Sequence, residues 1–539
     1  MELSYSSKSI NHLGLLAGIC GELAIVETID SLLPAESVDK IVSSGQSVLA
    51  MILNGLGFVN QAMYLSPKFF EDKPVDRLIG EGIQAAHLND DCLGRCLDAI
   101  HEYGSSKLYS LVVSRAIKIL DLDCSIGNMD MTNLSVYGNY SNQSDQAVQV
   151  VQGYSKDRRP DLNQVSLLLI TSYQSRIPIL MKALDGNQEE GQAYKEIIKN
   201  HIGELRVQTG CRFIVFDSKG YNQKNLEELL SNPSLKWLCR VPSNISAVQY
   251  LCSQVKLNDM TVLDENYSYY PLCSTYGGVK QRWLVIYSAQ LAKTKQATVL
   301  RQADKELDQQ GKALKKLMKK RFSCEGDALQ AVQDFKSTLK LTELNQQPEI
   351  IKKRKYLKPG KPSVKTPFKM EYSIQASLTL NQQRKKERLE KAGFFVMASN
   401  ELDQQALPDK EFLEIYKGQD GCEKGFRFLK NPEVVSSSLS LKKNERIEAL
   451  LMVMTLCLFV YACLEHKIRE LLKNRPGEAF FKDQKGKLTR KPTARWVFHC
   501  FLGIHLLNVN QEQKIVLNLN QIHKELLDLL GKSYWTYYY

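Results

Sequence analysis

Three acidic residues stand where a carboxylate could take part in catalysis. Asp130 lies inside an apolar segment with strand-like texture, where burying an acid is otherwise costly. Asp217 directly follows the apolar run RFIVF, and Glu423 lies in a segment expected to be helical. Mg²⁺ prefers oxygen ligands and keeps several waters, so two or three carboxylates suffice for an open site. Two such ions about 4 Å apart commonly support phosphodiester cleavage and transfer, which is the chemistry these acids predict.

Each acid also has an ordinary structural interpretation when it is considered alone. Asp217 precedes Ser218, Lys219 and Gly220 and fits a turn cap, while Glu423 fits a surface charge on a helix. The combination is more specific. One acid in a strand, a second after another strand and a third on a packed helix would converge at one edge of a sheet.

The elements that would position these acids read as a mixed α/β layer. Strands are expected at 124–136, 165–172, 178–184, 212–216 and 236–241, because these runs are apolar and of strand length. Helices are expected over 189–206 and 225–230. Three strands, a helix, a strand, a helix and a strand predict an α/β sandwich.

The ends of the chain read differently. Residues 1–120 show helical patterns with polar breaks and no strand-like alternation, so a helical domain is expected there. Further helices are expected over 409–430, 446–470 and 519–530. Strand texture returns at 370–378 and 394–399.

The middle of the chain is strongly basic. Residues 301–360 hold 15 Lys and Arg against 8 Asp and Glu, a net +7. Leu300, Leu307 and Leu314 recur every seven residues and suggest a helical hairpin or coiled-coil arm. Lys352–Lys355 and the KPGKP run at 358–362 read as an extended basic loop. Two interpretations of these basic residues stay open: a solvated charged face, and an arm that follows the phosphates of a nucleic acid.

Composition narrows the class of protein. The 539 residues are 43% apolar and 24% charged, which excludes a disordered chain, a collagen-like fibre and a disulfide miniprotein. The formal net charge of +12 fits a polyanionic partner.

The 13 cysteines form no C-x2-C pair, so reduced structural thiols are expected. Gly531-Lys532-Ser533 lacks the upstream glycine of a P-loop, so no nucleotide cofactor is expected.

One segment raises the question of a membrane. Residues 449–464 are uncharged for 16 positions, whereas a spanning helix needs roughly 20. Charged residues flank the run, so a buried core helix is the favoured interpretation. No basic segment precedes the apolar stretch 13–19, so no signal peptide is expected.

A resemblance to a known family enters with the residues around Glu423. Tyr416, Gln419, Glu423 and Lys430 resemble the Y-x2-R-x3-E-x6-K signature of bacterial insertion-sequence DDE transposases, with Gln in the Arg position. The stretch 423–432 is similar to the family's segment at its catalytic glutamate. Residues 153–161 and 216–221 are similar to the segments that follow its first and surround its second aspartate.

The resemblance implies a ribonuclease-H-like core with an inserted subdomain. The implied division is a helical domain for transposon-end binding at 1–120, core at 121–243, basic insertion at 244–392, core at 393–475 and a helical region at 476–539. Asp130, Asp217 and Glu423 would hold two Mg²⁺, with Mn²⁺ able to substitute. The residues that would contact DNA are Tyr416, Gln419, Lys430, Arg427, Lys156, Arg158 and Arg159.

The implied activity is cleavage at terminal inverted repeats followed by transfer of the 3′ ends to target DNA. The partners would be double-stranded repeat and target DNA, bound by a homodimer on paired ends in the bacterial cytoplasm. Two alternatives stay open: an inactive DNA-binding relic or regulator, and a nuclease of the same fold without strand transfer. Trp237 and Trp283 lie where related proteins hold a flipped base, although a core position is favoured for both.

Overall fold

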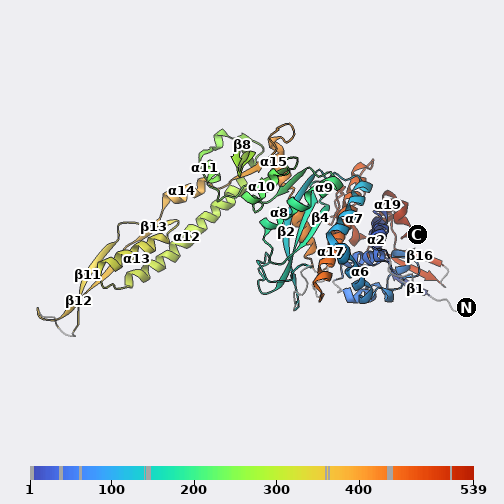
Figure 1. The fold of residues 1–539 in the computed structure, drawn as a ribbon, viewed down its shortest axis with the longest axis horizontal. Helices are drawn as coiled ribbons and strands as arrows, with labels where there is room; N and C mark the ends of the chain where they lie inside the picture. Colours follow the sequence, from blue (N-terminus) through green and yellow to red (C-terminus); the bar gives the residue numbers. More distant parts are fainter. Residues whose placement is uncertain are drawn as a thin grey trace. The chain divides into compact units, whose positions relative to one another are not determined.

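The computed structural model describes residues 5–34, 41–59, 63–138, 140, 147–357, 361, 364–431, 433, 441–509 and 513–539. The chain forms two compact units (Figure 1). The first unit comprises Met1–Cys239, Thr275–Gln281 and Ser399–Tyr539, and the second comprises Arg240–Ser274 and Arg282–Ala398. The second unit is therefore an insertion in the sequence of the first.

A mixed sheet lies at the centre of the first unit. Five strands of this sheet are hydrogen-bonded in the order β4-β3-β2-β5-β6. Neighbours β2/β3 and β3/β4 are antiparallel, whereas β2/β5 and β5/β6 are parallel. This α/β arrangement is compatible with a ribonuclease-H-like core. The strands, all five of them predicted, are β2 (Ile126–Val136), β3 (Asn163–Ser172), β4 (Pro178–Leu184), β5 (Phe213–Phe216) and β6 (Lys236–Arg240).

Helices flank this sheet, and two predicted helices are divided. The continuous helix expected over 189–206 is wrong, because α8 ends at Asn200 and α9 begins at Ile202. The continuous helix expected over 409–430 is wrong, because α15 ends at Lys417 and α16 begins at Asp420. Gly418 lies in the break, and a Cβ there would collide with the ring of Tyr173. Helix α16 packs on β2 and β3. The helices are α8 (Glu190–Asn200), α9 (Ile202–Thr209), α10 (Gln223–Leu230), α15 (Asp409–Lys417) and α16 (Asp420–Leu429).

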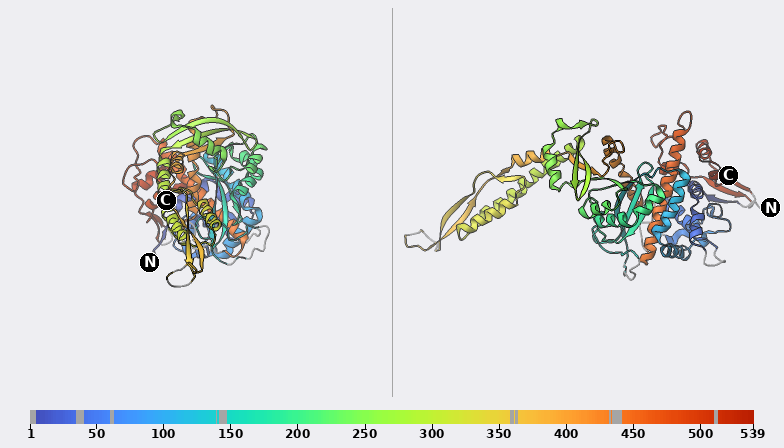
Figure 2. Two further views of the ribbon diagram at one scale, coloured as in Figure 1. Left: turned by 90° about the vertical axis from the view of Figure 1, so that its left-hand side faces the viewer. Right: turned by 45° about the horizontal axis from the view of Figure 1, so that its top comes forward.

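The long apolar helix α17 (Asn444–Asn474) supports the core of the first unit. Residues 451–460 are buried without interruption, and the helix packs against α1, α3, α6, α7 and α16 (Figure 2). Among the described residues it is the one helix long and apolar enough to cross a membrane. Because its apolar side chains are already covered by protein, it has the character of a core helix.

The two ends of the chain meet in a small sheet that the sequence did not predict. Strand β1 (Tyr5–Ser9) pairs with β15 (His505–Val509), which pairs with β16 (Gln513–Leu517). The all-helical interpretation of 1–120 and of 476–539 is wrong at these strands. The sequence YSSKS carries no apolar alternation, so only its distant partner reveals it as a strand.

The rest of these terminal regions is helical. Tyr534 and Tyr538 are buried against α1, and the Tyr538 hydroxyl donates to the Asn11 carbonyl at 2.6 Å. The helices are α1 (Leu13–Glu22), α2 (Ile25–Leu32), α3 (Ser44–Gly55), α4 (Ser66–Phe70), α5 (Val75–Leu78), α6 (Asp90–Tyr103), α7 (Ser105–Leu120), α18 (Ala494–Cys500), α19 (Gln521–Leu530) and α20 (Lys532–Trp535).

The second unit begins with strands that the sequence analysis missed and continues into a long helix. Strands β7 (Thr261–Val262), β8 (Tyr267–Tyr276) and β9 (Val279–Ser288) follow α11 (Ser246–Gln254). The expected helical hairpin is instead the 31-residue helix α12 (Ala289–Lys319), followed by α13 (Glu325–Ser337).

Two-stranded ribbons complete the second unit. Strand β11 (Glu349–Tyr356) pairs with β12 (Phe368–Gln375), and β10 (Thr342–Leu344) pairs with β13 (Leu378–Leu380). The extended basic loop expected at 352–355 is wrong, because these residues form half of β11. Of the KPGKP run, Lys358, Pro359, Gly360 and Pro362 lie outside the described residues. The unit ends with α14 (Gln382–Glu390) and β14 (Phe394–Ser399).

Truncation of a buried leucine on α17 tests its role as core. Leu456 is fully buried, so Leu456→Ala should lower the free energy of unfolding of the first unit by about 2–5 kcal/mol. Leu450 on the same helix is half-buried and provides the matched control, for which a smaller loss is expected. Chemical denaturation followed by circular dichroism measures both. Equal losses would contradict the packing described for α17.

Candidate functional site

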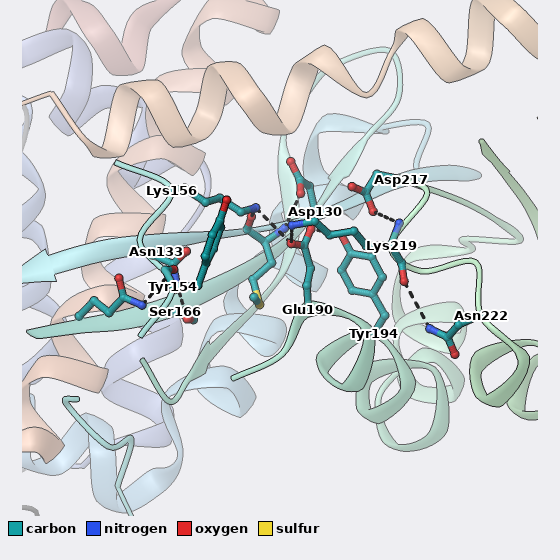
Figure 3. A network of polar contacts seen from close by, with 12 residues as sticks. Asp130, Asn133, Tyr154, Lys156, Ser166, Glu190, Tyr194, Asp217, Lys219 and Asn222 are labelled. Atoms are coloured by element: carbon teal, nitrogen blue, oxygen red, sulfur yellow. Dashed lines mark hydrogen bonds and ion pairs between the residues drawn. The ribbon is translucent and has the colours of Figure 1, made fainter. Parts of the chain in front are cut away.

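The parallel pairing of β2 and β5 brings two predicted acids together. Asn128 of β2 pairs with Val215 of β5, and the same offset two residues further sets Asp130 beside Asp217. Strand β5 is buried throughout and ends at Phe216, so Asp217 emerges at the carboxyl end of the strand. Both carboxyl groups are half-buried (Figure 3). Two of the three acids predicted from sequence therefore share one edge of the sheet.

A third carboxyl group, which the sequence analysis missed, lies with them. Glu190 occupies the first turn of α8 and is only 6% exposed. The buried Tyr194 hydroxyl donates to Glu190 Oε1 at 3.1 Å. Burial raises the pKa of Tyr194 well above its usual range, and the charges of Asp130, Asp217 and Glu190 act in the same direction. The negative charges of all three carboxyl groups therefore act on the Tyr194 hydroxyl.

Two lysines compensate part of this negative charge. Lys219 Nζ donates to Glu190 Oε2 at 2.6 Å, and Lys156 Nζ lies 3.4 Å from the same oxygen. Lys156 Nζ also donates to the Met131 carbonyl of β2. Lys156, predicted to contact DNA, therefore lies at the acidic site in this structure.

The raised pKa values of Asp130 and Asp217 indicate that the two lysines compensate only part of the negative charge at the site. Burial raises the pKa of Asp130 to about 6, with further increases from Glu190 and Asp217, although Lys156 and a hydrogen bond from the Met131 amide oppose the shift. Burial also raises the pKa of Asp217, and Glu190 adds to the effect. Holding both carboxyls ionised costs free energy here, a cost that a bound cation would offset.

Glu423 is carried by a helix anchored beside Asp130. Cys422 is buried, and its thiol donates to the Asn128 carbonyl at 3.0 Å and contacts Thr171 Oγ1 at 3.2 Å. Burial raises the pKa of Cys422 to about 12, and the charge of Asp130 contributes. Glu423 itself is exposed and makes no ion pair within the described residues.

The oxygen donors present fit Mg²⁺ in kind but are not gathered as a complete set. Among the described residues, no three His, Cys, Asp or Glu side chains are placed to hold one ion together. Asp130 and Asp217 supply carboxylate oxygens at one sheet edge, as a hard cation requires. Glu190 is engaged by lysines, and Glu423 lies in the first turn of α16.

The residues predicted to contact DNA lie on or next to α15 and α16 and in the segment 153–161. Arg427 lies on α16 one turn after Glu423, whereas Lys430 is the C-cap residue of this helix and pairs with Asp157 at 2.8 Å. Arg159 pairs with Asp161 at 2.7 Å, and Arg158 is exposed. Tyr416 is half-buried on α15. Gln419 is half-buried at the break, where its Nε2 has no hydrogen-bond partner among the described residues. Pro432, at the end of the quoted motif, lies outside the described residues.

The remaining sequence candidates are structural. Trp237 and Trp283 are buried in the units that contain them, as the favoured interpretation predicted. All 13 cysteines are free thiols, and eight of them are buried: Cys20, Cys96, Cys124, Cys211, Cys239, Cys422, Cys457 and Cys463.

Comparisons with known proteins match part of this chain to one family model and find six solved chains of similar structure. Residues 5–114 match a family model described as "Domain of unknown function (DUF4277)". No curated protein matches the sequence. A solved chain in the piggyBac transposase synaptic complex with hairpin DNA matches with a TM-score of 0.36 and 11% identity, covering 92% of this chain and 82% of that one. The bacterial insertion-sequence resemblance and the assigned site residues remain predictions.

The raised pKa of Asp130 predicts a pH-dependent stability. The pKa of about 6 in the folded state lies above the ordinary aspartate pKa of 3.8, so ionisation of Asp130 removes stability as pH rises through this window. The full effect is about 3 kcal/mol. In EDTA, Asp130→Asn should therefore be more stable than the wild type at pH 7.5 and gain little at pH 4. Denaturant titrations at both pH values measure the difference.

Asp123→Asn provides a control of opposite sign. Hydrogen bonds from Ser125 hold the pKa of Asp123 below its ordinary value, so its ionised form stabilises the fold. The substitution should destabilise at pH 7.5 and have less effect at low pH. A stability gain for Asp130→Asn that is independent of pH would contradict the account of Asp130.

The influence of Glu190 on Asp130 is testable by a double-mutant cycle. Because Glu190 raises the pKa of Asp130, the gain from Asp130→Asn at pH 7.5 should shrink when Glu190→Gln is already present. Glu189, its exposed neighbour, is the matched control, and Glu189→Gln should leave the gain unchanged. Additive effects of Glu190→Gln and Asp130→Asn would show that the two groups are independent.

Proposed function

We propose that this chain is a DNA transposase that uses three carboxylates to cleave DNA at transposon ends and to join the 3′ ends to target DNA. The observation that carries the proposal is the β2/β5 register, which brings Asp130 beside Asp217. The sequence resemblance around Tyr416, Glu423 and Lys430 supplies the reaction class. Support also comes from the anchoring of α16, the helix of Glu423, on the strand that carries Asp130.

In this proposal Asp130, Asp217 and Glu423 hold two Mg²⁺, or Mn²⁺ in its place. When bound, the ions would activate the attacking oxygen and stabilise the leaving oxygen. The attacking oxygen belongs to water during cleavage and to the 3′-hydroxyl during strand transfer. It forms a bond to phosphorus, and the bond from that phosphorus to the 3′ oxygen of the adjoining nucleotide in the same strand breaks, which leaves a free 3′-hydroxyl. No covalent bond between protein and DNA is required.

The lysines at the site have a separate task. Lys156 and Lys219 form ion pairs with Glu190, and these pairs keep the two ammonium groups close to the two aspartates. These cations lower the repulsion between carboxylates while no DNA is bound. A DNA phosphate approaching the site would meet both positive groups, which favours its binding.

The remaining DNA contacts would lie along α16 and the segment 153–161. Lys430 and Arg159 now pair with aspartates, so phosphates would exchange with carboxylate partners already present. Arg427 and Arg158 are exposed and offer further positive charge. Tyr416 and Gln419 complete the proposed surface, with Gln419 making a weaker contact than a bidentate Arg would.

The proposal extends to the assembly. A homodimer would act on paired terminal repeats, with double-stranded repeat and target DNA as its partners. It would work in the bacterial cytoplasm, associated with the nucleoid when bound. No nucleotide cofactor is required, because the strand exchange needs no external energy source.

Cleavage of a duplex carrying the ends that flank this gene tests the proposal. Asp130→Asn, Asp217→Asn and Glu423→Gln should each lower Mg²⁺-dependent cleavage at least about a hundredfold, since each removes a ligand oxygen. Binding of the duplex in EDTA should persist. Glu411→Gln, which changes an exposed glutamate on α15, is the matched control and should cleave normally.

A second readout does not depend on activity. Mg²⁺ should raise the melting temperature of the wild type, because a ligand that binds the native state stabilises it, and should raise that of Asp130→Asn less. Duplex binding without cleavage by the wild type in Mg²⁺ and in Mn²⁺ would favour a DNA-binding relic or regulator. Cleavage without joined product in a plasmid target would favour a nuclease.

A further inference from the structure

The ribbon β11–β12 in the second unit has a covered base and an uncovered outer part. Ile350 and Ile374, which pair across the ribbon, pack with Phe322, Ala328 and Val332 in a small core. Helix α13 supplies the last two of these residues and lies along the base of the ribbon. The ribbon continues beyond α13 (Figures 1 and 2). A two-stranded ribbon is only marginally stable alone, so its base is what fixes it to the unit.

On the outer part, the face that continues from the core combines cations with aromatic rings. Side chains alternate between faces, so Lys352, Arg354 and Tyr356 follow Ile350 on the same face. The guanidinium of Arg354 lies 4.8 Å from the ring centre of Phe368. Tyr356 and Phe368 remain 38% and 44% exposed. Contact with these rings keeps the cationic side chains extended, and it leaves their positive charge in place.

The opposite face is also basic. Lys355 lies directly across from Lys369, an arrangement of like charges that destabilises a ribbon. Glu371 serves both lysines, at 3.1 Å and 3.5 Å. Lys353, across from Glu371, has no ion pair within the described residues. The two strands carry five Lys and Arg against two Asp and Glu, and Lys361 and Lys365 near the turn are exposed too.

We propose that the outer part of the β11–β12 ribbon binds the backbone of duplex DNA. This inference rests on the proposed function, because it assumes that DNA is the partner. A two-stranded ribbon fits within the major groove of B-DNA, where the phosphates of the two strands flank it on either side. The excess positive charge on both faces matches that geometry. The contacts would be with phosphates, so they would be independent of base sequence.

The charge pattern favours a duplex over other polyanions. A single strand would be bound chiefly by stacking of its bases on exposed rings, and here the guanidinium of Arg354 already lies over the ring of Phe368. An acidic peptide would satisfy one face of the ribbon, whereas the lysines and arginine occupy both faces along four consecutive residues, 352–355.

The salt dependence of duplex binding tests the inference directly. The triple variant Lys353→Ala, Lys355→Ala and Lys369→Ala leaves the face that packs on α13 intact. If the three lysines contact phosphates, the slope of log Kobs against log salt should fall in magnitude by about 2–3, since each contact contributes about 0.9. Affinity at about 0.1 M salt should fall at least tenfold. Fluorescence anisotropy in EDTA measures both, on repeat-end and unrelated duplexes of equal length.

A matched triple variant separates the ribbon from general charge loss. Lys315→Ala, Lys316→Ala and Lys319→Ala remove three exposed charges from α12 in the same unit and should leave the slope unchanged. Equal losses in the two triple variants would overturn the inference. So would equal competition by polyglutamate at matched charge, or tighter binding of a single strand than of the duplex.

Failure of the inference is distinguishable from failure of the proposed function. If the wild type binds duplex and the ribbon variant keeps its slope, the ribbon assignment is wrong while the transposase proposal stands. If the wild type binds no duplex at all, the proposed function fails first. Circular dichroism and the melting temperature of the variant establish that loss of binding does not reflect unfolding.

Discussion

The first unit is organised around the mutual repulsion of carboxylates that the backbone does not allow to separate. Asp130 and Asp217 belong to neighbouring buried strands, and Glu190 is held in the first turn of a packed helix. None of the three can move away without disturbing the sheet or the core. The two lysines reduce this repulsion but do not remove it, as the raised pKa of Asp130 shows. Because part of the negative charge is uncompensated, the electrostatic potential at this site favours cation binding.

The helix that carries Glu423 is positioned by polar contacts as well as by apolar packing. The Cys422 thiol reaches the Asn128 carbonyl, and the Asn128 amide donates to the Gly418 carbonyl at 3.3 Å. The break at Gly418 allows the chain to pass close to the ring of Tyr173 before α16 begins. These contacts set the start of α16 against β2. The orientation of Glu423 then follows from helix geometry.

Positive charge is used in two different ways along the chain. Lys156, Lys219 and Lys430 are engaged with acidic partners close to the sheet, where they hold loops and helices in place. Lys353 and Arg354 in the second unit have no acidic partner within the described residues, and their neighbours on the ribbon share their sign. The first arrangement serves local structure, and the second leaves charge available to a polyanion.

The sequence by itself determined the elements whose signal is local. Strands β2 to β6 and β14 and helix α17 are read from apolar runs of suitable length, because burial on both faces imposes continuous apolar residues. Asp130 and Asp217 were identifiable because they interrupt or end such runs. Only tertiary structure decided the rest. Strand β1 exists because β15 lies beside it, and Glu190 matters because α8 brings it to two aspartates distant in sequence. Pairing partners and electrostatic neighbours are long-range properties, so a pattern of nearby residues does not contain them.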